Sequence, residues 1–267
     1  MYNIPMTNWS YPILIEFTNG SGTGFFIEKS KKSYLITAKH VLMDLNTNIF
    51  REKTVSIKYL SLDEQGELMG VTNFVINLEL LMKNGKIYVH PEQDIIVLDI
   101  FEYIDQGEVK MKFRDEVDIV GEIKGSFPQF GESSIIKLQE IKITNDIYVF
   151  GYPTSIGIKA NPQYDYNLPL IRKGIISQIY KDKGTIILDC QVQHGNSGGA
   201  VVQVAEVNGQ TIFGVIGVQI EYIPYITKQA IYGAGGFLAG EVQDNKNSGY
   251  SVAVAMNSVT ELIEKFN

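Results

Sequence analysis

The part of the sequence with the clearest chemical potential is a glycine-rich turn around one serine, from Gln193 to Gly199 (Q-H-G-N-S-G-G), which an apolar segment follows at once. Glycine at position 195 can adopt a positive φ and bring its N–H close to that of Ser197, so that two backbone donors converge on a developing oxyanion. Gly198 and Gly199 lack Cβ atoms and leave room for a carbonyl group to approach the hydroxyl. The turn favours acyl transfer, although the same letters also fit a plain glycine-rich hairpin turn.

A serine hydroxyl becomes a nucleophile at neutral pH only when an imidazole accepts its proton and a carboxylate orients that imidazole. The chain has three histidines, His40, His90 and His194. His40 directly follows an apolar segment, and Asp94 directly precedes another. A carboxylate at the start of such a segment is at least partly buried and needs a partner. Taken alone, each histidine also fits an ordinary packed or surface residue, and Asp94 also fits a cap at the start of a strand.

The order of three motifs along the chain separates these alternatives. His40 lies in T-A-x-H, Asp94 in H-P-x-x-D-I-x-V-L and Ser197 in G-N-S-G-G. This arrangement resembles the trypsin-like (chymotrypsin-fold) serine peptidases, most closely the bacterial HtrA-like protease domain without a PDZ module. Similar strand landmarks extend the resemblance over nearly the whole chain: Gly20 to Ile27, Val149 to Pro153, Gly174 to Ser177, Ile216 to Gln219 and Tyr250 to Val259.

The resemblance implies a role for each site residue. His40 would be the general base, Asp94 would fix its tautomer, and Ser197 would be the acylated nucleophile. The N–H groups of Gly195 and Ser197 would form the oxyanion hole. The implied reaction is hydrolysis of a peptide bond through a covalent acyl-enzyme, with no cofactor and no metal. The alternative is a catalytically latent barrel that acts as a protein-binding scaffold in a larger assembly.

By the same resemblance, the substrate side chain before the scissile bond enters a pocket beside Ser197. We expect no carboxylate on the floor of this pocket, which predicts cleavage after an apolar or small polar residue rather than after Lys or Arg. Glu221 on the facing strand is the nearest acid. Asn196 stands where digestive zymogens carry an aspartate for a new N-terminal ammonium, which predicts regulation by loop ordering instead. The expected substrate contacts are Gln191, Val192, His194, Val218, Gln219 and Ile220.

The elements that must position these residues are short runs rich in Ile, Val, Tyr and Phe, broken by Gly, Asn and Asp. Helical periodicity is weak between the runs, which predicts an all-β protein rather than parallel βαβ units. We expect two packed six-stranded antiparallel β-barrels (chymotrypsin-like) with a C-terminal helix. A soft segment from Gly121 to Ser134 predicts a linker, with an N-terminal barrel over residues 1–125 and a C-terminal barrel over residues 126–267.

Helices and long loops complete the expected fold. A capping box at Ser258 (S-V-T-E) predicts the start of the closing helix, whose apolar face recurs at helical spacing. The run from Leu78 to Met82 fits either a helix or a strand. Residues 159–173 and 222–249 read as long loops that flank the cleft, either gating access or decorating the surface.

Composition excludes several other classes of protein. The chain has 267 residues and a net charge of −7, which argues against a nucleic-acid partner. Its apolar stretches are too short to cross a bilayer as helices, so no membrane partner is expected. Cys190 is the single cysteine, so no internal disulfide can form. The N-terminus lacks the features of a secretory signal, and we expect a cytoplasmic protein. The expected partner is a polypeptide substrate, with a regulatory protein partner left open.

Overall fold

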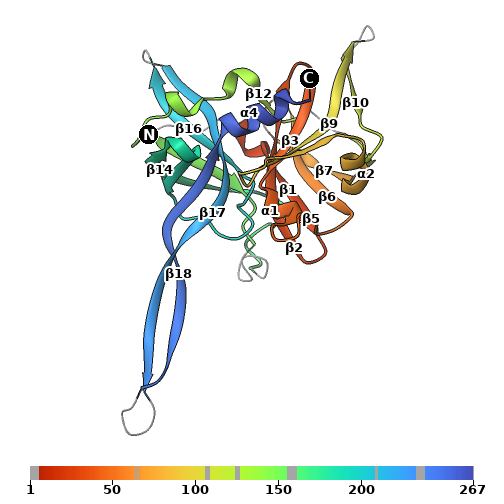
Figure 1. Cartoon of the computed structure of the whole chain (residues 1–267). Helices are drawn as coiled ribbons and strands as arrows, with labels where there is room; N and C mark the ends of the chain where they lie inside the picture. Colours follow the sequence, from red (N-terminus) through yellow and green to blue (C-terminus); the bar gives the residue numbers. More distant parts are fainter. Residues whose placement is uncertain are drawn as a thin grey trace.

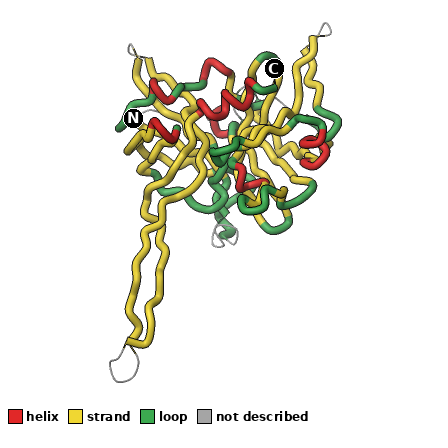
Figure 2. Tube along the Cα trace, viewed as in Figure 1, coloured by secondary structure: helices red, strands yellow, loops and turns green. Residues whose placement is uncertain are grey.

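Two curled β-sheets lie side by side in the computed structural model of the chain (Figure 1). The structure describes residues 6–63, 65, 67–105, 109–123, 127–154, 161–207, 210–232 and 238–266. Strands dominate, and the helices are short and lie at the edges of the sheets (Figure 2). The expected all-β fold of two packed barrels with a C-terminal helix is confirmed. Within the described residues, no helix is long and apolar enough to span a membrane.

The N-terminal sheet contains ten strands, more than the six expected, in the order β10-β9-β3-β2-β1-β6-β7-β11, with β8 on β9 and β12 parallel to β2. The additional pairings arise from short strands at the ends of the curled sheet. Its strands are β1 (Pro12–Phe17), β2 (Gly20–Lys29), β3 (Lys32–Thr37), β6 (Thr54–Leu62), β7 (Leu68–Asn77), β8 (Ile87–Val89), β9 (Ile96–Asp105), β10 (Val109–Phe113), β11 (Val117–Val120) and β12 (Phe130–Gly131).

An aromatic cluster fills the N-terminal sheet. The Phe127 ring lies 4.7 Å from the Phe26 ring, 4.9 Å from that of Tyr59 and 4.8 Å from that of Phe101. Phe127 therefore fixes part of the expected linker segment against this sheet. The expected boundary between residues 125 and 126 lies outside the described residues.

The C-terminal sheet closes into a barrel of six strands in the order β13-β14-β15-β18-β17-β16. The first residues of β13 and β15 alternate between half-buried and buried side chains, as expected for an antiparallel sheet with one face on the core. The strands are β13 (Asp146–Gly151), β14 (Leu170–Tyr180), β15 (Thr185–Asp189), β16 (Ala200–Val207), β17 (Gln210–Tyr232) and β18 (Leu238–Ala255).

A shared core joins the two sheets. Phe25, Ile36 and Val97 from the N-terminal half pack with Phe150 and Val218 from the C-terminal half, and all five are fully buried. Burying side chains of this size contributes about 1.5 to 3 kcal/mol each to folding. The interface is thus an apolar core in its own right, and it fixes the two sheets relative to each other.

The predicted closing helix is present as α4 (Met256–Glu264). The predicted capping box is wrong, because the helix begins two residues before Ser258, which is buried within it, and no side chain caps its N-terminus. The Phe266 ring that follows the helix lies 5.2 Å from the Tyr34 ring and 4.3 Å from the Tyr88 ring. The helix at the end of the C-terminal half therefore packs on the N-terminal half.

The run at Leu78, for which helix and strand both remained open, forms the helix α2 (Leu78–Lys83). Asn77 decides the outcome, since its side chain accepts a hydrogen bond from the N–H of Leu80 at 3.0 Å and caps the helix. Two further short elements follow β3, the helix α1 (Lys39–Leu42) and the strand pair β4 (Met43–Asp44) and β5 (Ile49–Phe50).

The prediction of a long loop over residues 222–249 is wrong. Strands β17 and β18 continue past the barrel and pair from Pro224↔Asn247 to Tyr232↔Leu238, forming a hairpin that projects into solvent (Figure 1). The β-branched and aromatic residues of this segment favour a strand and outweigh its glycines. The glycines at 233, 235 and 236 lie outside the described residues. In the other predicted loop, residues from Leu170 onward belong to β14, and residues 159–160 lie outside the described part.

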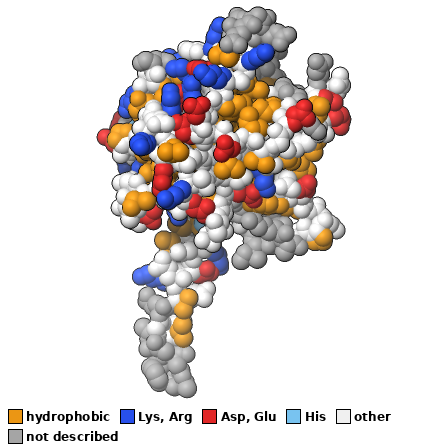
Figure 3. Space-filling model, turned by 90° about the vertical axis from the view of Figure 1, so that its right-hand side faces the viewer, with side chains coloured by type: hydrophobic (Ala, Val, Ile, Leu, Met, Phe, Trp, Pro, Cys, Tyr) orange, Lys and Arg blue, Asp and Glu red, His pale blue; other side chains and the backbone are white. Residues whose placement is uncertain are grey.

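One face of the surface is mixed in charge. Figure 3 shows acidic and basic side chains interspersed on this face, with no continuous basic stripe among the described residues drawn there. This face does not provide the cationic track that a phosphate backbone requires.

Candidate active site

A histidine and a carboxylate meet at one end of the N-terminal sheet. Strand β3 ends at Thr37, where it pairs with Ile96 at the start of β9. His40 follows the first strand and Asp94 precedes the second, so this pairing places them together. The Nδ1 atom of His40 lies 2.6 Å from Oδ2 of Asp94, and the backbone N–H of His40 donates to Oδ1 at 2.9 Å. The backbone N–H of Lys39 also donates to the Asp94 carbonyl, at 3.2 Å.

This geometry fixes the tautomer of His40. A carboxylate accepts hydrogen bonds, so the ring proton lies on Nδ1 and the lone pair lies on Nε2. The side chain of His40 is 30% exposed and that of Asp94 is 19% exposed. The pair is therefore partly shielded from solvent while Nε2 of His40 remains able to accept a proton from the cleft.

The serine turn follows in the C-terminal half, directly before β16. Gly195 and Gly198 have φ values of 92° and 88°, a region that favours glycine. Asn196 is fully buried inside the turn, where its side-chain oxygen accepts from the N–H of Gln193 at 3.0 Å and its carbonyl accepts from that of Gly199 at 3.0 Å. The glycines and the asparagine together shape the loop that presents Ser197.

Thr23 links this turn to the opposite half of the molecule, a role that the sequence analysis missed. Its backbone N–H donates to the Ser197 carbonyl at 2.9 Å, and its hydroxyl donates to the Gly195 carbonyl at 2.6 Å. The same hydroxyl accepts from the N–H of Tyr152 at 2.9 Å, and the Thr37 hydroxyl donates to the Thr23 carbonyl at 2.7 Å. The position of the serine turn thus depends on strand β2. The only sequence signal is the G-S-G-T-G stretch, read above as a landmark of the strand.

We expect Gly198→Ala to destabilise the fold by about 3 kcal/mol or more. A Cβ at position 198 would lie 2.0 Å from the Thr23 carbonyl oxygen and 2.1 Å from the Thr37 hydroxyl oxygen, at a φ of +88°. Gly85→Ala is the matched control, because position 85 has a φ of +68° and no heavy atom within 4 Å of the added Cβ. It should cost only about 1 kcal/mol. Urea unfolding measures both; equal stabilities of the two variants would refute the clash.

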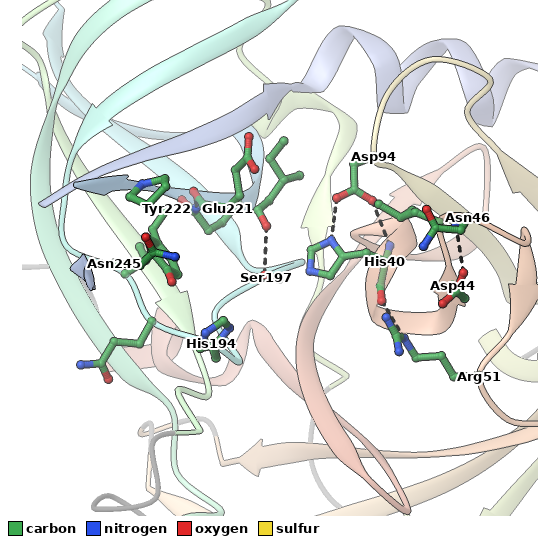
Figure 4. Close-up of a pocket in the computed structure, with 16 residues that line it drawn as sticks. His40, Asp44, Asn46, Arg51, Asp94, His194, Ser197, Glu221, Tyr222 and Asn245 are labelled. Atoms are coloured by element: carbon green, nitrogen blue, oxygen red, sulfur yellow. Dashed lines mark hydrogen bonds and ion pairs between the residues drawn. The ribbon is translucent and has the colours of Figure 1, made fainter. Parts of the chain in front are cut away.

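The Ser197 hydroxyl donates to the Ile220 carbonyl at 3.0 Å (Figure 4). Strand β17 is irregular here, since Gln219 pairs with Ala253 and Glu221 with Val252, which leaves Ile220 without a partner on β18. Its carbonyl is therefore free to accept from the serine. Within the described part of the chain, no hydrogen bond joins Ser197 to His40, although the His40 ring lies between Asp94 and the serine turn (Figure 4).

Two backbone donors beside the serine have no acceptor among the described residues. The N–H groups of Asn196, Gly198 and Gly199 donate to the carbonyls of Gln193, Gln219 and Asn196, respectively. The N–H groups of Gly195 and Ser197 donate to no other described residue. They are therefore free to bind an oxygen that develops negative charge next to the hydroxyl.

A cleft of about 620 Å³ lies over these groups and is lined from both halves (Figure 4). A smaller cavity of about 240 Å³ adjoins it and is lined by Thr154, Gln191, Gln193, His194, Tyr222 and Asn247. Of the residues expected to contact substrate, Val192, His194, Gln219 and Ile220 line the cleft, and Gln191 lines the smaller cavity. Val218, in contrast, is fully buried in the shared core and lines neither.

Other reactive groups are held away from this chemistry. Burial raises the pKa of the Cys190 thiol to about 11, because its charged form is disfavoured away from water. The thiol is therefore protonated and unreactive at neutral pH. Among the described residues, no group of three or more His, Cys, Asp or Glu side chains could hold a metal ion.

Comparison with known proteins places the chain in context. A family model described as "Trypsin-like peptidase domain" matches residues 22–208. The fold is similar to that of "HtrA-type protease AlgW with tripeptide", at 17% identity and a TM-score of 0.48, over 97% of this chain and 60% of that one. It is also similar to "Crystal structure of Deg5", at 16% identity and a TM-score of 0.48, over 96% of this chain and 88% of that one. The chain thus spans 60% of the length of AlgW. None of the curated proteins compared matches the sequence significantly.

Proposed function

The chain belongs to the family of trypsin-like peptidases, and from this we propose that it is a serine endopeptidase in which His40, Asp94 and Ser197 form the catalytic triad. The observation that carries the proposal is the His40–Asp94 pair, 2.6 Å apart, in one cleft with a serine turn whose two N–H groups lack acceptors. The substrate would bind extended, adding backbone hydrogen bonds to the irregular part of β17 around Ile220.

The proposed reaction begins when Ser197 leaves the Ile220 carbonyl and its oxygen attacks the scissile carbonyl carbon. Nε2 of His40 takes the hydroxyl proton, and the Asp94 carboxylate stabilises the imidazolium. The N–H groups of Gly195 and Ser197 bind the oxyanion of the tetrahedral intermediate. When the intermediate collapses, His40 gives the proton to the leaving amine. Water, deprotonated by His40, then releases the acyl group and restores the serine.

One observation favours the latent scaffold as a second candidate. The Ser197 hydroxyl is bound to the Ile220 carbonyl rather than to His40, so the resting arrangement is not yet that of the attacking nucleophile. A partner that shifts β17 at Ile220 would release the Ser197 hydroxyl from the Ile220 carbonyl. We therefore include a regulatory protein partner in the proposal. From the sequence, we also propose that the protein is cytoplasmic.

Labelling with a fluorophosphonate probe tests the proposed function. The probe should modify the purified protein, and Ser197→Ala should abolish labelling because the probe reacts only with an activated serine. Ser56→Ala is a control on strand β6, because Ser56 does not line the cleft. No labelling of the unaltered protein would support the scaffold instead, and labelling that persists in Ser197→Ala would assign the nucleophile to another residue.

We expect cleavage after apolar or small polar residues, with kcat/KM for an arginine at that position lower by about 10-fold or more. The side chains that line the smaller cavity are polar but carry no carboxylate, so a buried guanidinium would lack a partner there. Mass spectrometry of peptide-library digests measures the preference. Efficient cleavage after arginine would refute this preference. Loss of that cleavage in Glu221→Gln would show that the Glu221 carboxylate in the cleft wall causes it.

A further inference from the structure

His90 lies close to the catalytic pair but has no part in the proposed reaction. It follows β8, and the turn it begins ends at Asp94. We propose that His90 is a positioning residue, which holds the Asp94 turn in place for His40 and does so only as the neutral ring. The proposal rests on the function proposed for the His40–Asp94 pair.

The contacts of the His90 ring carry this inference. Its Nδ1 atom accepts the backbone N–H of Gln93 at 2.9 Å and that of Glu92 at 3.2 Å. Both partners are N–H donors, so Nδ1 contributes its lone pair and the ring proton lies on Nε2. The backbone N–H of His90 donates to the Ile95 carbonyl at 2.9 Å, which closes the turn on both sides of Asp94. One ring nitrogen thus satisfies two backbone donors that would otherwise face the solvent-exposed edge of the turn.

The position of this turn sets the position of the carboxylate. Both oxygens of Asp94 are engaged by His40, one by its ring and one by its backbone N–H. A shift of the turn would therefore change both hydrogen bonds at once. Between His90 and Asp94, the only described side chain that makes a hydrogen bond is that of Gln93, whose amide donates to the Lys183 carbonyl at 2.7 Å. His90 is the anchor inside the turn itself.

The surroundings of the ring favour its neutral form. Burial is the largest cause that lowers the pKa of His90, and Lys265, directly after α4, and Lys39 on α1 act in the same direction. Glu261 on α4 and Glu92 in the turn oppose them. The two N–H donors at Nδ1 also disfavour protonation, because a proton there would face two donors. When the ring does protonate, Nδ1 becomes a donor and both hydrogen bonds are lost.

The test compares two substitutions at this position in the full chain. His90→Ala removes the acceptor and is expected to lower kcat for peptide hydrolysis by about 10-fold to 100-fold, with a smaller change in KM, since the carboxylate is displaced rather than removed. His90→Asn supplies an uncharged amide oxygen that can accept the same N–H groups, as Asn does in local turns. It should restore kcat to within about threefold of the unaltered protein.

Glu92→Gln is the matched control. It lies in the same turn and keeps its backbone N–H, and the Glu92 side chain makes no hydrogen bond or ion pair with any described residue, so kcat should stay within about threefold of the unaltered protein. Equal kcat values for His90→Ala and the unaltered protein would overturn the proposal. So would a loss in His90→Asn as large as that in His90→Ala, because an acceptor would then be irrelevant.

A readout that needs no substrate separates this proposal from the proposed function. With three histidines in the chain, the ring resonances can be assigned by nitrogen NMR. His90 should show an unprotonated Nδ1 at neutral pH, and the resonance of the His40 Nδ1 proton should shift in His90→Ala but not in His90→Asn, because a displaced Asp94 no longer accepts from Nδ1 of His40 at 2.6 Å. An unchanged His40 Nδ1 proton resonance in His90→Ala refutes the positioning role, whether or not the protein hydrolyses peptides.

The pH dependence of stability tests the requirement for a neutral His90 ring and has a predicted direction. The pKa of His90 is lowered in the folded protein, so the native state binds this proton less readily than the unfolded chain does. The stabilisation from the neutral ring is therefore complete above the unfolded value of about 6.5 and is lost as the pH falls through the lower folded value. Thermal unfolding should show the unaltered protein losing stability relative to His90→Asn over this range. A constant difference between the two proteins would contradict the requirement for a neutral ring.

Discussion

Ser197→Ala is expected to lower kcat for peptide hydrolysis by about 10⁴-fold or more. The substitution removes the only atom that can form the acyl-enzyme, while the free N–H groups at 195 and 197, which would bind the oxyanion, stay in place. Residual hydrolysis would come from that oxyanion site and from substrate positioning alone. KM should change little, since the hydroxyl contributes one hydrogen bond to the Ile220 carbonyl and none to the cavity that accepts the substrate side chain.

The measurement is a full kinetic comparison with Ser56→Ala as the control. The Ser197→Ala protein should unfold within about 1 kcal/mol of the unaltered protein, because it loses a single neutral hydrogen bond. A kcat that falls by less than about 10-fold would show that the serine is not the nucleophile. Loss of activity together with a large loss of stability would instead indicate that the turn had collapsed.

Asp94→Asn should lower kcat at neutral pH by about 10⁴-fold. An asparagine fills the same space. Its oxygen can still accept the backbone N–H of His40, which lies 2.9 Å from Oδ1 of Asp94 in the unaltered protein. It no longer stabilises the imidazolium, and its NH₂ group next to Nδ1 favours the tautomer whose proton lies on Nε2. His40 then presents a proton to Ser197 where a lone pair is required.

Kinetics over a range of pH, with Glu92→Gln as a control in the same turn, test this prediction. The Asp94→Asn protein should also lose fluorophosphonate labelling at neutral pH while keeping its fold. An Asp94→Asn protein that retains more than about one tenth of kcat would place the orienting carboxylate elsewhere.

The placement of His40, Asp94 and Ser197 in one cleft could be predicted because each motif is local. His40, Asp94 and Ser197 each lie within a few residues of a strand end that the apolar pattern marks, so their identities follow from short stretches of sequence. The β-rich class and the closing helix could be predicted for the same reason. Thr23 could not be predicted, because its contacts with the serine turn span the two halves and depend on how the two sheets pack.

The role of Ile220 and the form of the hairpin were also beyond the sequence. The Ile220 carbonyl reaches Ser197 because of an irregular register between β17 and β18, and single residues carry no sign of such a shift. In the hairpin, the glycines suggested a loop, whereas pairing with a second strand favoured extended backbone. Cross-strand pairing is a non-local effect, and intrinsic propensity is a weak guide to it.

Three of the four hydrogen bonds of Thr23 cross between the two halves, and two of these hold the carbonyls of Gly195 and Ser197. The serine turn of the C-terminal half is therefore shaped by a strand of the N-terminal half. Under the proposed function, heat or denaturant that separates the two halves would abolish hydrolysis, because the turn would lose these contacts. Thermal inactivation would then follow the loss of the interface between the halves.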